Sequence, residues 1–115
     1  IAAETEVRLG RPSQGVEYLN SLLKFRYKSG TFTPYSGLSQ AQALDLILKE
    51  RRKELAFRGL RWSDLRRLNL NPTTATTLTR TVAGESYTLL PNSPRYVFPI
   101  PEDELKLNGL QPNNR

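Results

Sequence analysis

The chain has 115 residues and a formal net charge of +6, and it contains neither cysteine nor histidine. These absences exclude disulfides, cysteine nucleophiles, histidine acid–base catalysis and the usual zinc sites. The length suffices for one small domain with a modest core. No apolar run approaches the roughly 18 residues that a membrane-spanning helix needs, and we expect no signal peptide here. Because the first residues read as helix interior, we expect a processed or truncated piece of a longer protein.

The positive charge is concentrated in residues 1–68, which carry 13 Lys and Arg against 7 Asp and Glu, while residues 69–115 carry four of each. A basic half can attract phosphate or acidic polysaccharide. The simpler interpretation, which we prefer, is an arginine-rich helical region whose charges are partly paired and partly solvated.

The N-terminal residues predict a helix pair. Residues 2–9 fit the last turns of a helix that Gly10 ends, and Pro12 begins an amphipathic helix over residues 12–27. The order helix, glycine, short turn, proline, helix resembles half a tetratricopeptide-type repeat. Gly15 costs the second helix about 1 kcal/mol of propensity, and either a close helix approach or sequence accident explains it.

A loop rich in turn-forming residues is predicted over residues 28–38. Its aromatic residues Phe32 and Tyr35 can stack on sugar rings, but we expect them to pack the loop onto the body of the domain. The loop ends at Ser39, which forms a predicted capping box with Gln42 at the start of the next helix.

That helix is predicted to run from Ser39 to about Arg58, with Gly59 as its stop or kink. Its apolar residues occupy more than one face, so we expect it to be sandwiched between other elements. Arg51 lies within the apolar stripe and is tolerable there only beside a carboxylate, of which Glu54 is one turn away. The stripe consists of Leu44, Leu48, Arg51, Leu55 and Arg58, with Ile47 and Glu54 beside it and Ala56 and Phe57 pointing elsewhere. A short helix over residues 60–68 follows.

The C-terminal third is predicted to be mostly extended. Threonine is dense in residues 73–85, which favours half-exposed extended structure, and short strands are predicted at 87–90 and 96–98. The tail from 105 to 115 has no periodicity, so we expect it to lie along the surface or fray. The acidic run 102–104 can cap a helical turn, and it is a poor candidate for catalysis because no basic partner stands at a fixed spacing.

No catalytic, cofactor-binding or metal-binding residue is predicted, and we do not expect an enzyme. The main alternative is a small basic nucleic-acid-binding domain, because eight basic residues and one tryptophan lie between Lys49 and Arg67. Phosphate binding requires these cations on one exposed face, and here they are scattered around the helix. That scatter favours a buried ion-pair network, and we expect no nucleic-acid partner.

Residues 47–67 match the pattern Ile-Leu-x-Glu-Arg-x-x-Glu-Leu-Ala-Phe-x-Gly-x-Arg-Trp-x-Asp-Leu-x-Arg at every fixed position. This pattern resembles the helical hallmark of the SusD/RagB family. Residues 9–20 are similar to the family's last tetratricopeptide-like helix pair, and residues 96–101 resemble its Tyr-x-x-Pro-Ile-Pro element. The chain departs from the family at Arg58, where Glu is common, at Ser63, where an aromatic is common, and in its 108–113 ending.

The resemblance implies a C-terminal portion of a longer surface lipoprotein of Bacteroidetes. Such a protein binds glycans or other nutrients at the extracellular face of the outer membrane and works with a SusC-like TonB-dependent transporter. The ligand-binding aromatic residues belong to upstream segments of the parent protein, so the ligand-binding residues of this chain are unknown.

The resemblance also implies structural roles for the motif residues and a mainly α fold with tetratricopeptide-like helical pairs and a small irregular C-terminal segment containing a β-hairpin. Residues 1–68 are the predicted helical part, and residues 69–115 are an extended segment of the same domain. The predicted polar network consists of Glu50, Arg51, Glu54, Arg61, Asp64 and Arg67, and the predicted core residues are Leu55, Phe57, Trp62 and Leu65.

Overall fold

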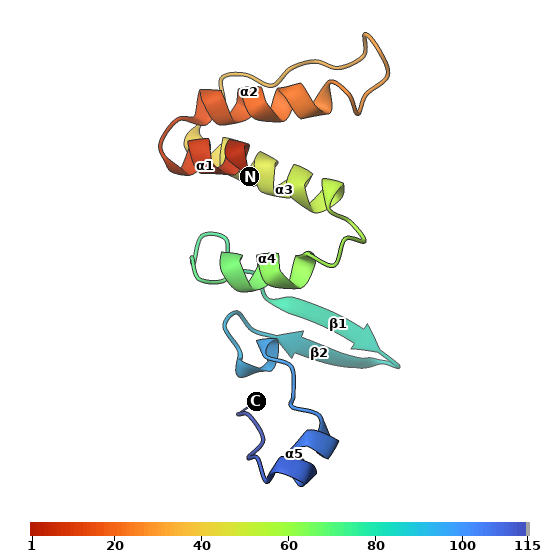
Figure 1. Cartoon of the computed structure of the whole chain (residues 1–115). Coiled ribbons are helices and arrows are strands. Elements are labelled where there is room, and N and C mark those ends of the chain that lie inside the picture. Colours follow the sequence, from red (N-terminus) through yellow and green to blue (C-terminus); the bar gives the residue numbers. More distant parts are fainter. Residues whose placement is uncertain (115) are drawn as a thin grey trace. The chain divides into compact units, whose positions relative to one another are not determined.

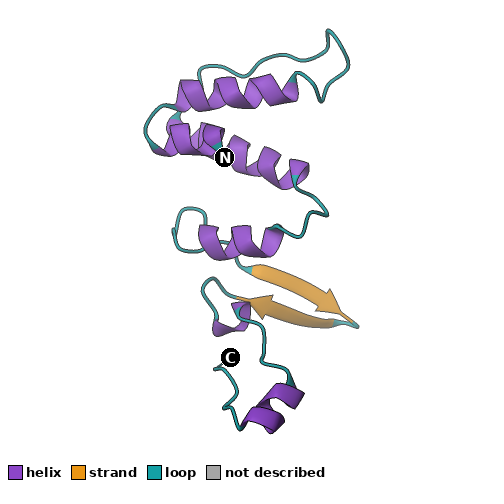
Figure 2. Cartoon of the chain, viewed as in Figure 1, coloured by secondary structure: helices purple, strands orange, loops and turns teal. Residues whose placement is uncertain are grey.

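A computed structural model describes residues 1–114 and confirms a mainly α-helical chain with one β-hairpin (Figures 1 and 2). The chain divides into two compact units, residues 1–58 and the residues from Gly59 onward. The first unit contains α1 (Ala2–Arg8), α2 (Pro12–Leu23) and α3 (Gln40–Glu54). The second contains α4 (Arg61–Leu68), β1 (Leu78–Val82), β2 (Glu85–Leu89), the 3-10 helix η1 (Pro94–Tyr96) and α5 (Glu102–Asn108).

The three helices of the first unit enclose its core. Helix α1 packs against both α2 and α3, and Gly10, with φ of +80°, makes the tight turn between α1 and α2 (Figure 1). The side chain amide of Gln40, at the start of α3, donates to the carbonyl of Val7 over 2.8 Å and so caps the end of α1. The core residues are Val7, Val16, Leu19, Leu23, Ala43 and Ile47.

Close packing between α1 and α2 explains the glycine within α2. A Cβ atom placed on Gly15 would lie 2.5 Å from Cγ2 of Val7 and 2.6 Å from the carbonyl oxygen of Ala3. Of the two explanations that the sequence left open, the close helix approach is therefore the correct one. The glycine lowers helix propensity and in return lets the two helices touch along their backbones.

Helix α2 ends at Leu23, four residues before the predicted end, and the loop that follows is tied back to it. Asn20 donates its side chain amide to the Tyr35 carbonyl over 2.9 Å and accepts from the Tyr35 N–H over 3.0 Å. Phe32 packs against the core as predicted, with its ring 5.2 Å from that of Tyr27. Tyr35 is held by its backbone, and it stays 37% exposed.

Helix α3 begins with the predicted capping box, in which Ser39 and Gln42 exchange hydrogen bonds of 2.9 and 3.3 Å. It ends at Glu54 rather than at Arg58, because Phe57 has φ of +60° and Gly59 has φ of +71°. Left-handed backbone cannot continue a right-handed helix. The most buried face of α3 also differs from the predicted leucine stripe, and it carries Ala43, Ile47 and Glu50 at helical spacing.

In the second unit, β1 and β2 pair antiparallel from Leu78↔Leu89 to Val82↔Glu85. The hairpin loop has two residues, Ala83 and Gly84, both with positive φ. This is the turn geometry whose twist matches that of paired strands.

The segment after the hairpin differs from the sequence prediction in two places. Residues 96–98 do not form the predicted strand. Tyr96 instead ends η1, because Pro94 presets a helical φ and the Ser93 hydroxyl accepts from the Arg95 N–H. Residues 105–108, which were predicted to belong to an irregular tail, are part of helix α5, which begins at Glu102. Its first turn holds three acidic residues, as the dipole favours, and Gly109 ends it with φ of +60°.

None of the helices among residues 1–114 combines the length and the apolar character needed to cross a bilayer.

Candidate functional site

The structure places the residues of the predicted polar network in two separate units. In the first unit, the buried carboxylate of Glu50 accepts from Lys53 over 2.5 Å. The Glu54 carboxylate binds Arg26, with Nε to Oε1 at 2.6 Å and Nη2 to Oε2 at 2.9 Å. This bidentate pair joins the end of α3 to the turn after α2, a tie that sequence spacing did not indicate. Arg51 is half-buried, and its pairing with Glu54 stays a prediction.

Two ion pairs of the first unit shift the pKa values of their carboxyl groups. The hydrogen bond from Arg26 holds the pKa of Glu54 below its usual value, and the charge of Arg26 acts in the same direction. The hydrogen bond from Arg11 likewise lowers the pKa of Glu6. Both carboxylates are therefore ionised at neutral pH, and their role is to hold helix ends in place rather than to exchange protons.

In the second unit the motif contributes a tryptophan-centred contact. The Trp62 indole N–H donates to the Tyr96 carbonyl over 3.1 Å, and its ring lies 4.8 Å from the Tyr96 ring and 5.7 Å from the Phe98 ring. The 62 and 96–98 regions, which resemble two separate family motifs, therefore meet in the fold. Arg67 and Asp64 form the predicted pair, with Nη2 to Oδ1 at 3.3 Å.

The four predicted core residues do not all lie in a core. Leu65 is buried and Trp62 is half-buried, as their helical spacing on α4 predicts. Leu55 is only half-buried, and Phe57 is fully exposed. The prediction for Phe57 was wrong because α3 ends before it, so that its direction is set by a left-handed turn instead of a helical face.

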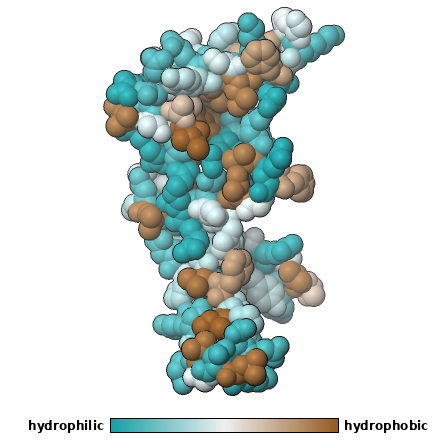
Figure 3. Space-filling model, in the orientation of Figure 1, coloured by the Kyte–Doolittle hydropathy of each residue, from teal (hydrophilic) through white to brown (hydrophobic). Residues whose placement is uncertain are grey.

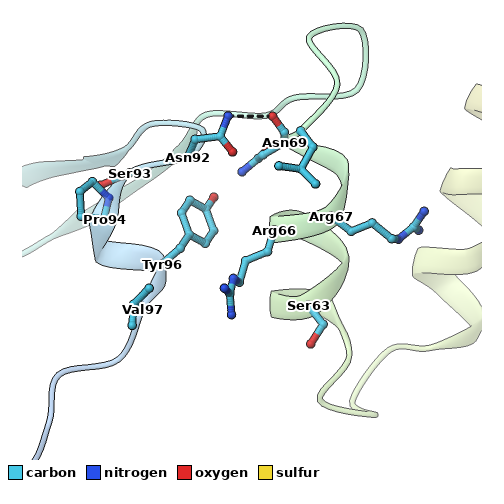
Figure 4. Close-up of a pocket in the computed structure, with 10 residues that line it drawn as sticks. Ser63, Arg66, Arg67, Asn69, Asn92, Ser93, Pro94, Tyr96 and Val97 are labelled. Atoms are coloured by element: carbon cyan, nitrogen blue, oxygen red, sulfur yellow. Dashed lines mark hydrogen bonds between the residues drawn. The ribbon is translucent and has the colours of Figure 1, made fainter. Parts of the chain in front are cut away.

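A cavity of about 520 Å³ lies between α4 and residues 92–97 of the second unit (Figure 4). Ser63, Arg66 and Arg67 of α4 line one side, and Asn92, Pro94 and Tyr96 line the other. The Asn92 side chain amide donates to the Asn69 carbonyl over 3.0 Å, which fixes this loop against the end of α4.

Two buried polar groups of this cavity have no hydrogen-bond partner among the described residues: Nδ2 of Asn69 and the hydroxyl of Tyr96. Asn69 is 3% exposed and Tyr96 4%. The Asn69 side chain oxygen, in contrast, accepts from the Thr76 N–H over 3.0 Å. Because a buried polar group without a partner costs about 1–3 kcal/mol, such a pair in a native protein calls for an explanation.

This cavity was not predicted from the sequence. From the sequence, Asn69 belongs to an Asn-Leu-Asn-Pro run that is expected to end a helix, and Asn92 belongs to a Pro-Asn-Ser-Pro run that is expected to form a turn. Both statements are correct, since Asn69 follows α4 and Asn92 has φ of +59°, but turn chemistry alone does not reveal that two turns face one another. Among residues 1–114, no group of three or more acidic side chains is arranged to hold a metal ion.

The sequence model of the SusD family matches residues 1–114, which is nearly the whole chain. The chain belongs to the SusD family. SusD-like protein P2 of Formosa agariphila is 35% identical over 124 residues, covering 99% of this chain and 23% of that protein. SusD-like protein P38 of the same organism is 36% identical over 74 residues, covering 60% of this chain and 15% of that protein. This SusD-family chain thus spans about a quarter of the length of the first relative.

Proposed function

We propose that this chain is the C-terminal portion of a non-catalytic, cell-surface protein that binds a glycan or another nutrient and works with a SusC-like TonB-dependent transporter. The observation that carries the proposal is the family match over residues 1–114. The parent protein, by which we mean the longer protein that contains this chain, would be a lipoprotein on the extracellular face of the outer membrane of a member of the Bacteroidetes.

Within that protein, the chain has mainly a supporting role. The charged residues of the 47–67 pattern, which could suggest ligand binding, form local ion pairs such as Arg26–Glu54 and Asp64–Arg67. Most of the glycan contacts would therefore come from segments outside this chain. The exposed apolar side chains of the chain also support a structural role, because the rest of the parent protein can pack against them (Figure 3).

The proposal is tested by tagging the parent protein in its native host and isolating outer membranes. We expect surface labelling of the tag on intact cells, co-purification of a TonB-dependent transporter, and retention of a polysaccharide in affinity electrophoresis. A parent protein that stays inside the cell, or that binds neither transporter nor nutrient, would refute the proposal. Hydrolysis of a retained polysaccharide would refute the non-catalytic part alone.

A further inference from the structure

The cavity beside α4 has the composition of a ligand site rather than of a packing defect. Its walls combine the apolar surfaces of Leu70, Pro94 and Val97 with hydrogen-bonding side chains. Its volume of about 520 Å³ lies within the range of small-molecule sites, which are mostly apolar with a few polar groups placed to orient a ligand. A sugar ring presents the matching chemistry, with apolar C–H faces and polar hydroxyl groups on its rim.

The polar groups of the cavity are placed to act together. Figure 4 shows the hydroxyl end of Tyr96 and the side chain of Asn69 converging on the same side of the cavity, next to Asn92. The Asn69 amide can only donate, and the Tyr96 hydroxyl can donate or accept. Since neither has a partner among the described residues, both are available to a ligand that brings acceptor oxygens.

The charge of the cavity is positive. Arg66 reaches from α4 toward Tyr96 and Val97 in Figure 4, and its guanidinium forms no ion pair or hydrogen bond within residues 1–114. No aspartate or glutamate lines the cavity. Arginine presents a planar set of donors that suits carboxylate and sulfate groups.

We infer that this cavity binds a sugar unit that carries a carboxylate or sulfate group. Arg66 holds the anionic group, while Asn69 and Tyr96 donate to acceptor oxygens of the same unit. This assignment deepens the proposed function, on which it rests, because it names an anionic glycan as a ligand and gives this chain a binding site of its own.

The test is the affinity of the purified parent protein for oligogalacturonate, for a sulfated galactan oligosaccharide and for a neutral galacto-oligosaccharide, measured by calorimetry. We expect one of the two anionic ligands to bind at least tenfold more tightly than the neutral one. Tighter binding of oligogalacturonate would identify the anionic group as a carboxylate, and tighter binding of the sulfated galactan would identify it as a sulfate. Equal binding of all three, or binding of none, overturns the inference.

Arg66→Gln should lower the affinity for the anionic ligand roughly tenfold, because a charge-assisted hydrogen bond is lost. Arg52→Gln on α3, which removes the same charge from an exposed residue that does not line the cavity, should change the affinity less than twofold. Tyr96→Phe should lower affinity severalfold while the melting temperature stays the same or rises. Equal effects of Arg66→Gln and Arg52→Gln, or an unchanged affinity in Tyr96→Phe, would contradict the site.

The two proposals fail separately. A parent protein that binds a neutral nutrient and its transporter, with no effect of Arg66→Gln, would refute the anionic-sugar site and leave the proposed function standing. Binding of oligogalacturonate that depends on Arg66 in a protein without a transporter partner would do the reverse.

Discussion

At the scale of one residue, Gly15 lowers the helix propensity of α2 but allows α2 to pack closely against α1. We expect Gly15→Ala to destabilise the chain by about 1–2 kcal/mol, because overpacking costs about 1–3 kcal/mol and the gain in helix propensity offsets at most about 1 kcal/mol of it. The measurement is the urea midpoint of the parent protein. Ser13→Ala, an exposed change in the same helix, is the control and should shift stability by less than about 0.5 kcal/mol. A more stable Gly15→Ala variant would mean that α1 and α2 do not touch here.

Asp64 and Arg51 are expected to support the fold and to bind nothing. Removing one member of a buried ion pair costs about 3–5 kcal/mol, but the Arg67 side chain is 44% exposed and can be solvated. We therefore expect Asp64→Ala to cost about 1–2 kcal/mol, and Arg51→Ala, at a half-buried position, about 1–3 kcal/mol. Transporter binding by the folded fraction of both variants should be unchanged, and so should ligand binding by Arg51→Ala, because Arg51 does not line the cavity beside α4. Wild-type stability with lost binding in both variants would make these helices a contact surface instead.

At the scale of elements, the Arg26–Glu54 pair links the turn after α2 to the end of α3, and it makes this link sensitive to pH. The pKa of Glu54 is lowered in the folded chain, so its contribution to stability is present above the unfolded value of about 4.5 and is lost as pH falls through the folded value. Glu6 acts in the same direction. We expect urea midpoints that are flat near neutrality and fall below about pH 4.5.

The variant Glu54→Gln should make that acid slope shallower, because a group that no longer titrates cannot contribute to it. Glu85→Gln, in the hairpin, serves as the control and should keep the wild-type slope. An acid slope that is identical in Glu54→Gln and wild type would show that the pair does not tie the two helices together in solution.

The hairpin turn carries a residue that its geometry does not favour. Ala83 has φ of +51°, although glycine and asparagine are the usual residues in the left-handed region. Ala83→Asn would create an Asn-Gly turn with the same backbone, and we expect it to raise the free energy of unfolding by about 0.5–1 kcal/mol. Thermal melts of the parent protein would measure this. Ala83→Val, which adds a β-branched side chain at positive φ, should do the opposite.

Elements that are determined by a few adjacent residues could be predicted from the sequence, and elements that depend on distant contacts could not. The capping box at Ser39 and the turn at Gly10 depend on a few adjacent residues, and the sequence predicted both. The end of α3 was predicted too late, because the left-handed backbone at Phe57 interrupts an apolar pattern that continues in the sequence. The end of α2 was also predicted too late, and α5 was not predicted because it buries no residue and so shows no apolar periodicity. The cavity beside α4 could not be predicted, since it requires Asn69 and Asn92 to meet over 23 residues of chain.

At the scale of the whole molecule, the amount of buried apolar surface is small. Within residues 1–114 the buried apolar residues are eight, two of which, Leu65 and Tyr96, belong to the second unit. Large apolar side chains, in contrast, are exposed in both units, among them Phe25 at 78%, Phe57 at 107% and Leu107 at 81%. On the face drawn in Figure 3, apolar side chains lie at the surface in several places. Burial of apolar surface is the main favourable contribution to folding. A chain that leaves this much apolar surface exposed therefore lacks part of that stabilisation.

We therefore expect the isolated 115-residue chain to be partly molten, or to associate with the remainder of the parent protein when that is supplied in trans. Near-ultraviolet circular dichroism should show weak tertiary signals while far-ultraviolet spectra retain helix, and the thermal transition should be broad. Residues 1–58, which hold six of the eight buried apolar residues, should keep more protection from hydrogen exchange than the second unit. A sharp, cooperative melt of the isolated monomer would contradict this expectation, because it would show that the two small cores suffice without any covering surface.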